Sequence, residues 1–280
     1  MTFPARIESR AGRVVYAAAV FFVLAVWLLP LAGVALTSIR GAEELNRGNF
    51  WGWPDEVQIG NYATVLTASR MGQFVVNSLL ITLPAVAAAV ALSALAGFAL
   101  AKHGFRGNVL LLMTFVAGNL VPFQTLMIPV RDLMLGLGLY DTRWALIVFH
   151  AAFQTGFCTL FMRNFIRELP DALLETARIE GAGEFKVFWN VVLPLLRPAL
   201  AACTVLLFTF VWNDYFWALV LVQSDDVRPL TAGLQSLRGM WQTDWQLVSA
   251  ASILAALPPV ALFFVMQRQL IDGLTFGTRK

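Results

Sequence analysis

The sequence has 280 residues, of which 59% are hydrophobic and only 13% are charged, and its mean hydropathy is +0.71. This balance excludes an ordinary soluble domain and indicates an integral membrane protein. The net charge of +3 does not indicate a nucleic-acid partner, because the basic residues are scattered between apolar runs rather than clustered.

The N-terminal segment carries Arg6, Arg10 and Arg13, and an uncharged run over residues 14–39 follows. That run is long enough to cross a hydrocarbon core of about 30 Å. A cleavable signal peptide is the competing interpretation, but the run exceeds a typical signal-peptide core and five more apolar segments come after it. We therefore predict an uncleaved first span.

Further apolar runs predict five more spans, over residues 71–101, 107–130, 144–162, 198–222 and 246–267. The predicted fold class is an all-α integral membrane bundle of six transmembrane helices, forming one transmembrane domain over residues 1–280. With the N-terminus inside, inner segments hold 13 of the 20 Lys and Arg residues. This bias predicts cytoplasmic termini and a cytoplasmic loop over residues 163–197.

Two longer segments are predicted outside the membrane, over residues 40–70 and 223–245. The first carries the pair Asn61-Tyr62, for which we expect a structural role. The second is polar and longer than a tight turn, with Asp225 and Asp226 near its start.

Polar side chains inside the predicted spans are costly in hydrocarbon and need a partner, a cavity or a pathway. Asn77-Ser78 and Asn119 suit hydrogen bonds between helices, with contact to a transported substrate as the alternative. His150 and Gln154 share one helical face with Phe157 and Phe161, and sugars bind such mixtures of polar and aromatic groups. A packed, hydrogen-bonded histidine is the alternative for His150.

Asp214 is the most costly of these residues, because a carboxylate at mid-bilayer costs about 2.5–3.5 kcal/mol unless water or a partner stabilises it. It follows Asn213 and precedes Trp217 in an aromatic stretch. The three residues either line a translocation path or brace the bundle, and the sequence leaves both open.

The loop over residues 163–197 predicts two short helices. Pro170 and Asp171 suit the start of the first helix, Arg178 suits its last turn, and Gly181 can close it, which gives Asp171 to Glu180. Apolar residues at helical spacing after Gly183 predict a second, amphipathic helix that continues to Pro194. We expect this pair to dock another protein.

Motifs for catalysis are absent from the sequence, which has no G-x-x-x-x-G-K-[ST], no H-E-x-x-H and no G-x-S-x-G. Cys158 and Cys203 lie in apolar stretches without metal-binding spacing and are predicted as small core residues. We expect neither an enzyme nor a cofactor or metal site in this chain.

Three segments together carry a resemblance to a known family. Glu175-Thr176-Ala177, Gly181 and Val191-x-Leu193-Pro194 resemble the EAA loop of bacterial ABC importer permeases, which reads Glu-Ala-Ala, Gly and Ile-x-Leu-Pro. Thr176 and Val191 depart from it by small changes of shape. Residues 212–216 and 267–275 resemble the second permease of sugar importers of the maltose and glycerol-phosphate type.

The resemblance implies a type I importer permease bundle that pairs with a homologous second permease, two ABC ATPase subunits and a periplasmic or lipid-anchored solute-binding protein. ATP and Mg would then bind in the ATPase subunits. It implies ATPase coupling through Glu175, Thr176, Ala177, Gly181, Ala182, Leu193 and Pro194, and a possible pathway at Asn119, His150, Gln154, Asn213, Asp214 and Trp217. It also implies that the segment 223–245 reaches the binding protein and that the tail 270–280 reaches the ATPases.

Two other function classes remain open. A secondary transporter would use His150 and Asp214 for proton coupling and would need no ATPase, although the inverted repeats typical of that class are not evident. A membrane scaffold or sensor would use the polar loop only to recruit a partner. Within the importer interpretation, the residues do not choose among sugars, polyols and glycerol phosphate.

Overall fold

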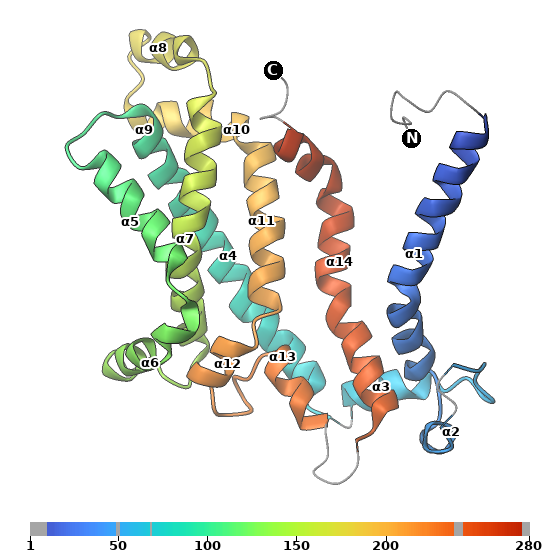
Figure 1. Cartoon of the computed structure of the whole chain (residues 1–280). Helices are drawn as coiled ribbons and strands as arrows, with labels where there is room; N and C mark the ends of the chain where they lie inside the picture. Colours follow the sequence, from blue (N-terminus) through green and yellow to red (C-terminus); the bar gives the residue numbers. More distant parts are fainter. Residues whose placement is uncertain (1–9, 49–50, 68, 238–242, 276–280) are drawn as a thin grey trace. The chain divides into compact units, whose positions relative to one another are not determined.

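The computed structural model describes residues 10–48, 51–67, 69–237 and 243–275, and the regular structure in these ranges is helical (Figure 1). The chain divides into two units. The first comprises residues 1–69 and 237–254, and the second comprises residues 70–236 and 255–280. The long helix α14 (Trp245–Thr275) contributes to both units.

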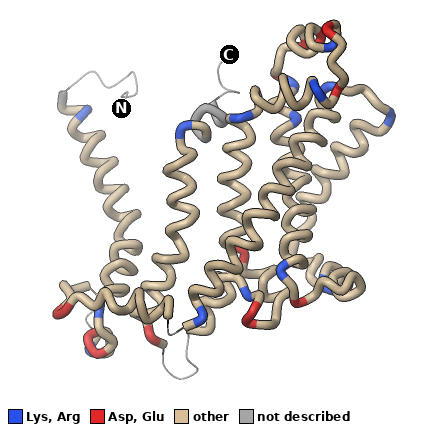
Figure 2. Tube along the Cα trace, turned by 180° about the vertical axis from the view of Figure 1, so that it is seen from behind, with Lys and Arg blue, Asp and Glu red and all other residues tan. Residues whose placement is uncertain are grey.

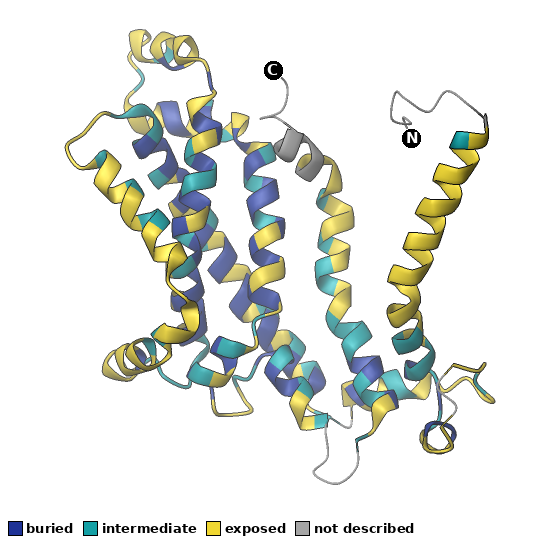
Figure 3. Ribbon diagram, viewed as in Figure 1, coloured by how far each residue is buried: buried dark blue, intermediate teal, exposed yellow. Residues whose placement is uncertain are grey.

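The first unit contains α1 (Arg10–Ser38), α2 (Ala42–Asn46), α3 (Gly60–Thr67) and the start of α14. Helix α1 is strongly apolar, yet its side chains are exposed along almost its whole length (Figure 3). Phe21 is 74% exposed and Trp27 is 78% exposed. Because such a surface is stable only in hydrocarbon or against another protein, α1 has the properties of a membrane-spanning helix.

The side chains of Asn61 and Tyr62 form hydrogen bonds at the end of α1. The Asn61 amide donates hydrogen bonds of 2.9 Å to the carbonyl oxygens of Ser38 and Arg40, and the Tyr62 hydroxyl lies 2.8 Å from Ser38 Oγ. The last carbonyls of a helix lack partners within the helix, so these contacts satisfy them. The structural role predicted for the pair is confirmed.

The second unit is built around two long helices, α4 (Met71–Lys102) and α7 (Arg143–Arg167), which pack along each other. Gly97 allows the closest approach, because a Cβ at this position would lie 2.9 Å from Met162 Cβ and 3.0 Å from the backbone nitrogen of Arg163. Cys158 on α7 and Cys203 on the next long helix are fully buried, which confirms them as core residues.

The other helices of this unit surround that pair. They are α5 (Asn108–Leu120), the 3₁₀ turn η1 (Phe123–Leu126), α6 (Met127–Gly136), α11 (Arg197–Trp212), α12 (Phe216–Leu221), α13 (Leu230–Gly233), the 3₁₀ turn η3 (Leu234–Leu237), and the remainder of α14. Charged residues gather at the two ends of these helices, with mostly uncharged helix between them (Figure 2). This is the distribution expected of a unit that crosses a membrane.

Four helices in the described ranges are long and apolar enough to span a bilayer, or up to six if each of two bent pairs forms one span. The predicted third run, 107–130, is not one straight helix. Helix α5 ends at Leu120, and the chain turns by 96° into η1 and α6. Pro122 explains the break, because proline disfavours helical backbone at the preceding residue and removes a donor.

The predicted fifth run, 198–222, is also interrupted. Helix α11 ends at Trp212, and Asn213 to Tyr215 separate it from the short α12. The aromatic rings of Phe123 and Phe216 meet edge to face, with centroids 5.5 Å apart. The residues just after the two breaks therefore lie against each other.

The EAA-like loop, residues 163–197, lies at one end of the second unit (Figure 1). It contains α8 (Asp171–Ile179), α9 (Glu184–Val187), the π-turn η2 (Phe188–Val192) and α10 (Leu193–Leu195). The first predicted helix is confirmed. The second runs from Glu184 to Leu195 and does not stop before Pro194.

Candidate coupling loop and transport residues

Gly181 closes α8 through a Schellman motif. Its backbone φ is +84°, its N–H donates to the carbonyl of Arg178 at 3.0 Å, and the next N–H, of Ala182, donates to Ala177 at 3.0 Å. This 6→1 and 5→2 pair of hydrogen bonds satisfies the free carbonyls of the last turn. Because L-residues rarely adopt a positive φ, glycine suits this position for a backbone reason.

The EAA-like residues lie mostly on the surface of the loop. Glu175, Thr176 and Gly181 are exposed, whereas Ala177 and Ala182 are half-buried. A shallow pocket of about 280 Å³ opens between α8 and η2, and its lining residues are Ala177, Glu180, Gly181, Ala182, Lys186, Asn190 and Val191. Ile179, at the end of α8, is 86% exposed. Small residues and an exposed isoleucine together form a surface that a partner's side chain can approach closely.

The π-turn explains how the second helix passes Pro194. A proline in an α-helix removes one hydrogen bond and clashes with the carbonyl four residues earlier, which here belongs to Asn190. The wider turn over Phe188–Val192 contains that carbonyl and relieves the clash. Pro194 is exposed, while Leu193 is half-buried against the rest of the unit.

Two residues at the end of α4 hold this loop, and the sequence did not single them out. The Lys102 ammonium donates to the carbonyl of Leu169 at 2.8 Å and to the Asp171 carboxylate at 2.6 Å. His103 Nε2 lies 3.0 Å from a Glu184 carboxylate oxygen. Their partners lie 69 and 81 residues further along the chain, so no local pattern points to them.

Glu184 is shared between α4 and α8. Besides His103, it accepts two hydrogen bonds from the guanidinium of Arg178, at 2.8 and 3.2 Å. The Arg178 bonds, and then the bond from His103, lower the pKa of Glu184 below its usual value. The hydrogen bond from Lys102 likewise lowers the pKa of Asp171. Both carboxylates are therefore ionised at neutral pH.

His150 and Asp214 meet inside the second unit. His150 Nε2 lies 3.5 Å from the Asp214 carboxylate, and their side chains are 5% and 14% exposed. The carboxylate also accepts backbone hydrogen bonds from Trp217 at 3.3 Å and from Ala218 at 3.1 Å. The Asp214 carboxylate, one residue before the N-cap Tyr215, therefore caps the free N–H groups at the start of α12 and has partners for its charge within the chain.

The remaining predicted pathway residues do not share one surface with this pair. Trp217 is buried against Phe149, with ring centroids 3.9 Å apart. Gln154 is buried, whereas Asn213 and Asn119 are exposed and bond to carbonyls one turn earlier on their own helices.

The predicted polar-aromatic face of α7 is also partly buried and partly exposed. His150 and Gln154 are buried inside the unit, but Phe157, on the same predicted face, is 45% exposed. Helix α7 contacts α4, α5 and α11, so its faces are covered by different neighbours along its length. The four side chains therefore do not share one environment along α7.

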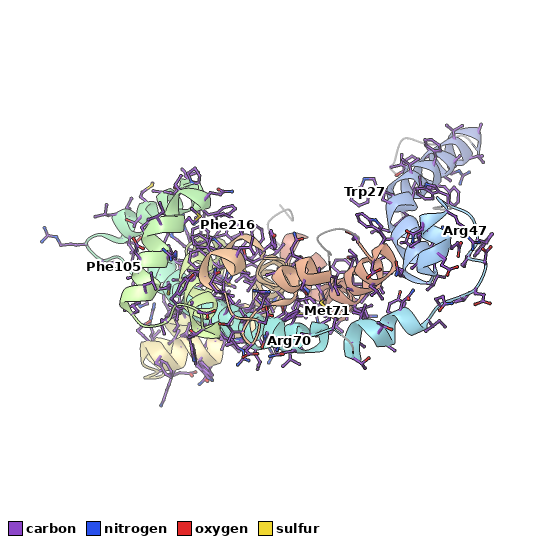
Figure 4. The ribbon with its side chains drawn as sticks, turned by 90° about the horizontal axis from the view of Figure 1, so that it is seen from below. Trp27, Arg47, Arg70, Met71, Phe105 and Phe216 are labelled. Atoms are coloured by element: carbon purple, nitrogen blue, oxygen red, sulfur yellow. The ribbon has the colours of Figure 1, made fainter. Side chains whose placement is uncertain are left out.

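Asn77 and Ser78 organise the opposite end of the unit. The Asn77 amide donates to the carbonyls of Asp226 at 3.0 Å and Arg228 at 2.9 Å, and Ser78 Oγ accepts the N–H of Leu230 at 2.8 Å. Arg70, directly before Met71 at the start of α4 (Figure 4), pairs with Asp226 at 3.3 Å. These residues therefore hold the segment 224–230 to α4; its continuation over 238–242 lies outside the described residues.

Apolar helices of spanning length, broken helices inside the bundle and a polar helical loop at one end define a multi-pass membrane protein of the transport class. Residues 75–275 match the family model described as "Binding-protein-dependent transport system inner membrane component". The chain therefore belongs to this family of ABC importer permeases, as the motifs in its sequence predict.

Curated relatives cover nearly the whole chain. The chain is 35% identical over 269 residues to the osmoprotective compounds uptake permease protein GgtD of Synechocystis, a match that covers 94% of this chain and 90% of that protein. It is 31% identical over 259 residues to the arabinooligosaccharides transport system permease protein AraQ of Halalkalibacterium halodurans, covering 91% and 92%.

A solved structure has the same fold. A chain of a bacterial ABC transporter involved in the import of the acidic polysaccharide alginate superposes with a TM-score of 0.82 at 23% identity, covering 96% of this chain and 99% of that one. The predicted all-α importer permease fold is confirmed.

Proposed function

We propose that this chain is a membrane-spanning permease subunit of an ATP-driven importer for a sugar or a related polyol or glycerol-phosphate solute. The family is named for dependence on a binding protein, and the relatives are named for uptake of osmoprotective compounds and arabinooligosaccharides. The chain resides in the bacterial cytoplasmic membrane with its EAA-like loop on the cytoplasmic side. It has no catalytic role of its own, and ATP and Mg bind in partner subunits.

The observation that carries this proposal is the surface of the EAA-like loop. Gly181 has a positive φ, no atom beyond its chain neighbours lies within 4 Å of the position that its Cβ would take, and Ile179, two residues earlier, is 86% exposed. An exposed apolar side chain next to an open glycine turn suits a protein partner better than water. Each of two ATPase subunits receives one such loop, one from this chain and one from a homologous second permease.

The exposed apolar surface of α1 supports contact with a second membrane protein as well as with lipid. Because α1 buries none of its spanning window within the chain, its Phe, Trp and Leu side chains require cover from bilayer lipid or from the second permease. Closure of the ATPase pair on ATP moves the two EAA-like loops together and switches the bundles from inward to outward opening. A periplasmic or lipid-anchored binding protein delivers the solute to the outer side.

His150 and Asp214 fit a bracing role. The Asp214 carboxylate receives two backbone hydrogen bonds and faces a buried imidazole, so its charge is stabilised by the fold itself. These contacts give no support to the proton-coupled alternative, which needs the pair to exchange protons with a pathway. Nucleic acid has no part in the proposal.

The test is co-purification of the subunits together with measurement of ATP turnover. The tagged chain is expressed with its genomic neighbours and purified in mild detergent, and the ATPase activity is measured with and without the soluble binding protein and a panel of sugars. The proposal predicts ATPase chains in the complex and a rise in activity with the binding protein and one solute. Uptake that proceeds without ATPase chains and follows a proton gradient would contradict it.

A further inference from the structure

The EAA-like loop is joined to the rest of the second unit by two covalent links and by polar and apolar side-chain contacts with α4. The chain enters the loop from α7 through Glu168 to Pro170 and leaves it into α11, with a bend of 74° between residues 184–195 and α11. No covalent link joins the loop to α4. Lys102 and His103 are polar side chains at the end of α4 that bind carboxylates of the loop.

Lys102 is the stronger of these two anchors. Its side chain is only 7% exposed, and a nearly buried ammonium requires hydrogen-bond acceptors and a counter-charge. The carbonyl of Leu169 and the carboxylate of Asp171 supply both, one just before α8 and one in its first turn. Lys102 therefore fixes where α8 begins relative to the end of α4.

His103 fixes the other end of the loop's two-helix unit. It contacts Glu184 in the first turn of α9, and Glu184 in turn binds Arg178 in the last turn of α8. The His103 ring also packs edge to face on Phe98, with centroids 5.1 Å apart. The carboxylate of Glu184 thus ties α8, α9 and α4 together at one point.

An apolar contact lies beneath these charges. The rings of Phe98 on α4 and Phe188 in η2 are 5.4 Å apart, and Val187 is fully buried. This contact keeps the loop attached if a charge is removed, but apolar contacts are not directional and do not fix an angle. The hydrogen bonds set the orientation of α8 and α9, because they require defined distances and directions.

Helix α4 also reaches the other end of the unit. Asn77, near its start, holds the segment that contains Asp226 and Arg228, and between the two ends α4 packs along α7 at Gly97. Among the described elements, α4 thus combines polar contacts to the EAA-like loop with polar contacts to segment 224–230. A rotation of α8 at one end would therefore act first on the end of α4 that Lys102 and His103 occupy.

We propose that Lys102 and His103, with Asp171 and Glu184 as their partners, are positioning residues that transmit movement of the EAA-like loop to α4 and so couple ATP hydrolysis to transport. This rests on the proposed function, because it requires the ATPases to dock on that loop. It adds residues outside the EAA-like motif and assigns them a role distinct from docking itself. The contact geometry predicts uncoupling, in which ATP is hydrolysed without solute movement.

The experiment uses the complete importer in proteoliposomes and measures ATP hydrolysed per solute transported. The variants are Lys102→Asp, Asp171→Lys, their combination, and His103→Leu and His103→Gln, where glutamine retains a donor toward Glu184. Arg47→Glu is the control, because Arg47 pairs with Glu43 in the first unit with both side chains largely exposed. We expect the ratio to rise roughly 3- to 30-fold in the single charge variants and in His103→Leu.

The double variant Lys102→Asp with Asp171→Lys should return the ratio of ATP hydrolysed to solute transported toward the wild-type value, and so should His103→Gln. Loss of folded protein would not produce such a rescue. An unchanged ratio in Asp171→Lys and His103→Leu complexes that retain their ATPases would overturn the positioning role and leave the proposed function intact. Absence of ATPase chains from the wild-type complex would instead overturn the proposed function.

Discussion

Substitution of Gly181 separates the backbone requirement of the EAA-like loop from its contact with a partner. At φ +84°, an L-residue costs about 1–2 kcal/mol, a factor of roughly 5–30 in the population of the turn, and a β-branched residue costs more. Since no atom beyond its chain neighbours lies within 4 Å of the added Cβ, this cost comes from the local backbone and not from packing against the rest of the chain. Gly181→Val should therefore remain in the membrane but lose the turn and abolish uptake.

Two comparison variants make this prediction specific. Gly183 lies in the same loop at φ −69°, also with open space around its Cβ position, so Gly183→Val tests added bulk without the positive-φ cost, leaving only the smaller cost of valine at the N-cap of α9. Asparagine tolerates positive φ, so Gly181→Asn adds bulk while keeping the turn. Normal uptake in Gly181→Val at a wild-type level of membrane protein would refute the reasoning. Loss of ATPase co-purification in Gly181→Asn, with a stable membrane subunit, would place the partner against this residue.

Three further results are expected. Asp214→Ala should lower the yield of folded protein, because loss of the cap of α12 lowers the stability of the fold by about 0.5–2 kcal/mol. The control Asn213→Ala should change thermal stability little. Equal thermal stabilities of the two variants would contradict the bracing role of Asp214. Gly97→Ala should destabilise the folded protein by about 1–3 kcal/mol, because the added Cβ would lie 2.9 Å from an α7 side chain. The control Gly118→Ala, which has open space around its Cβ position in α5, should be neutral or stabilising in the same thermal melting assay. Lys102 lowers the pKa of Asp171, so the contribution of Asp171 to loop stability is fully present above the unfolded pKa of about 3.9 and is lost as pH falls through the lower folded pKa. Proteolysis of the loop should therefore rise as pH falls below about 4, and Asp171→Ala should reduce this rise without removing it, because the pKa of Glu184 is lowered as well.

The features that the sequence predicted correctly depend on residues that are close together along the chain. The bounds of α8 follow from Pro170, Asp171 and the glycine at its end, all of which act within one turn of the helix. The same is true of α4 and α7, whose long apolar runs determine their helical character. The structural role of Asn61-Tyr62 also agrees with the structure, although its partners at the end of α1 are not evident from the sequence.

The features that escaped prediction depend on distant partners or on interruptions within apolar runs. Lys102 and Asp171 are 69 residues apart, and Asn77 and Asp226 are 149 residues apart, so only the fold brings them together. The break after α11 falls at Asn213-Asp214, two polar residues within an apolar and aromatic stretch whose composition favours one span, and the Asp214 carboxylate caps a new helix there. Pro122 did give a local signal for the break after α5.

The most direct test of the central claim is uptake of radiolabelled oligosaccharide into proteoliposomes that contain this chain, its second permease and the ATPase pair, with ATP enclosed and the binding protein outside. The importer function predicts accumulation that requires ATP, requires the binding protein and disappears in Gly181→Val. Accumulation that persists without ATP or ATPase subunits, and that collapses when a proton gradient is dissipated, would contradict it.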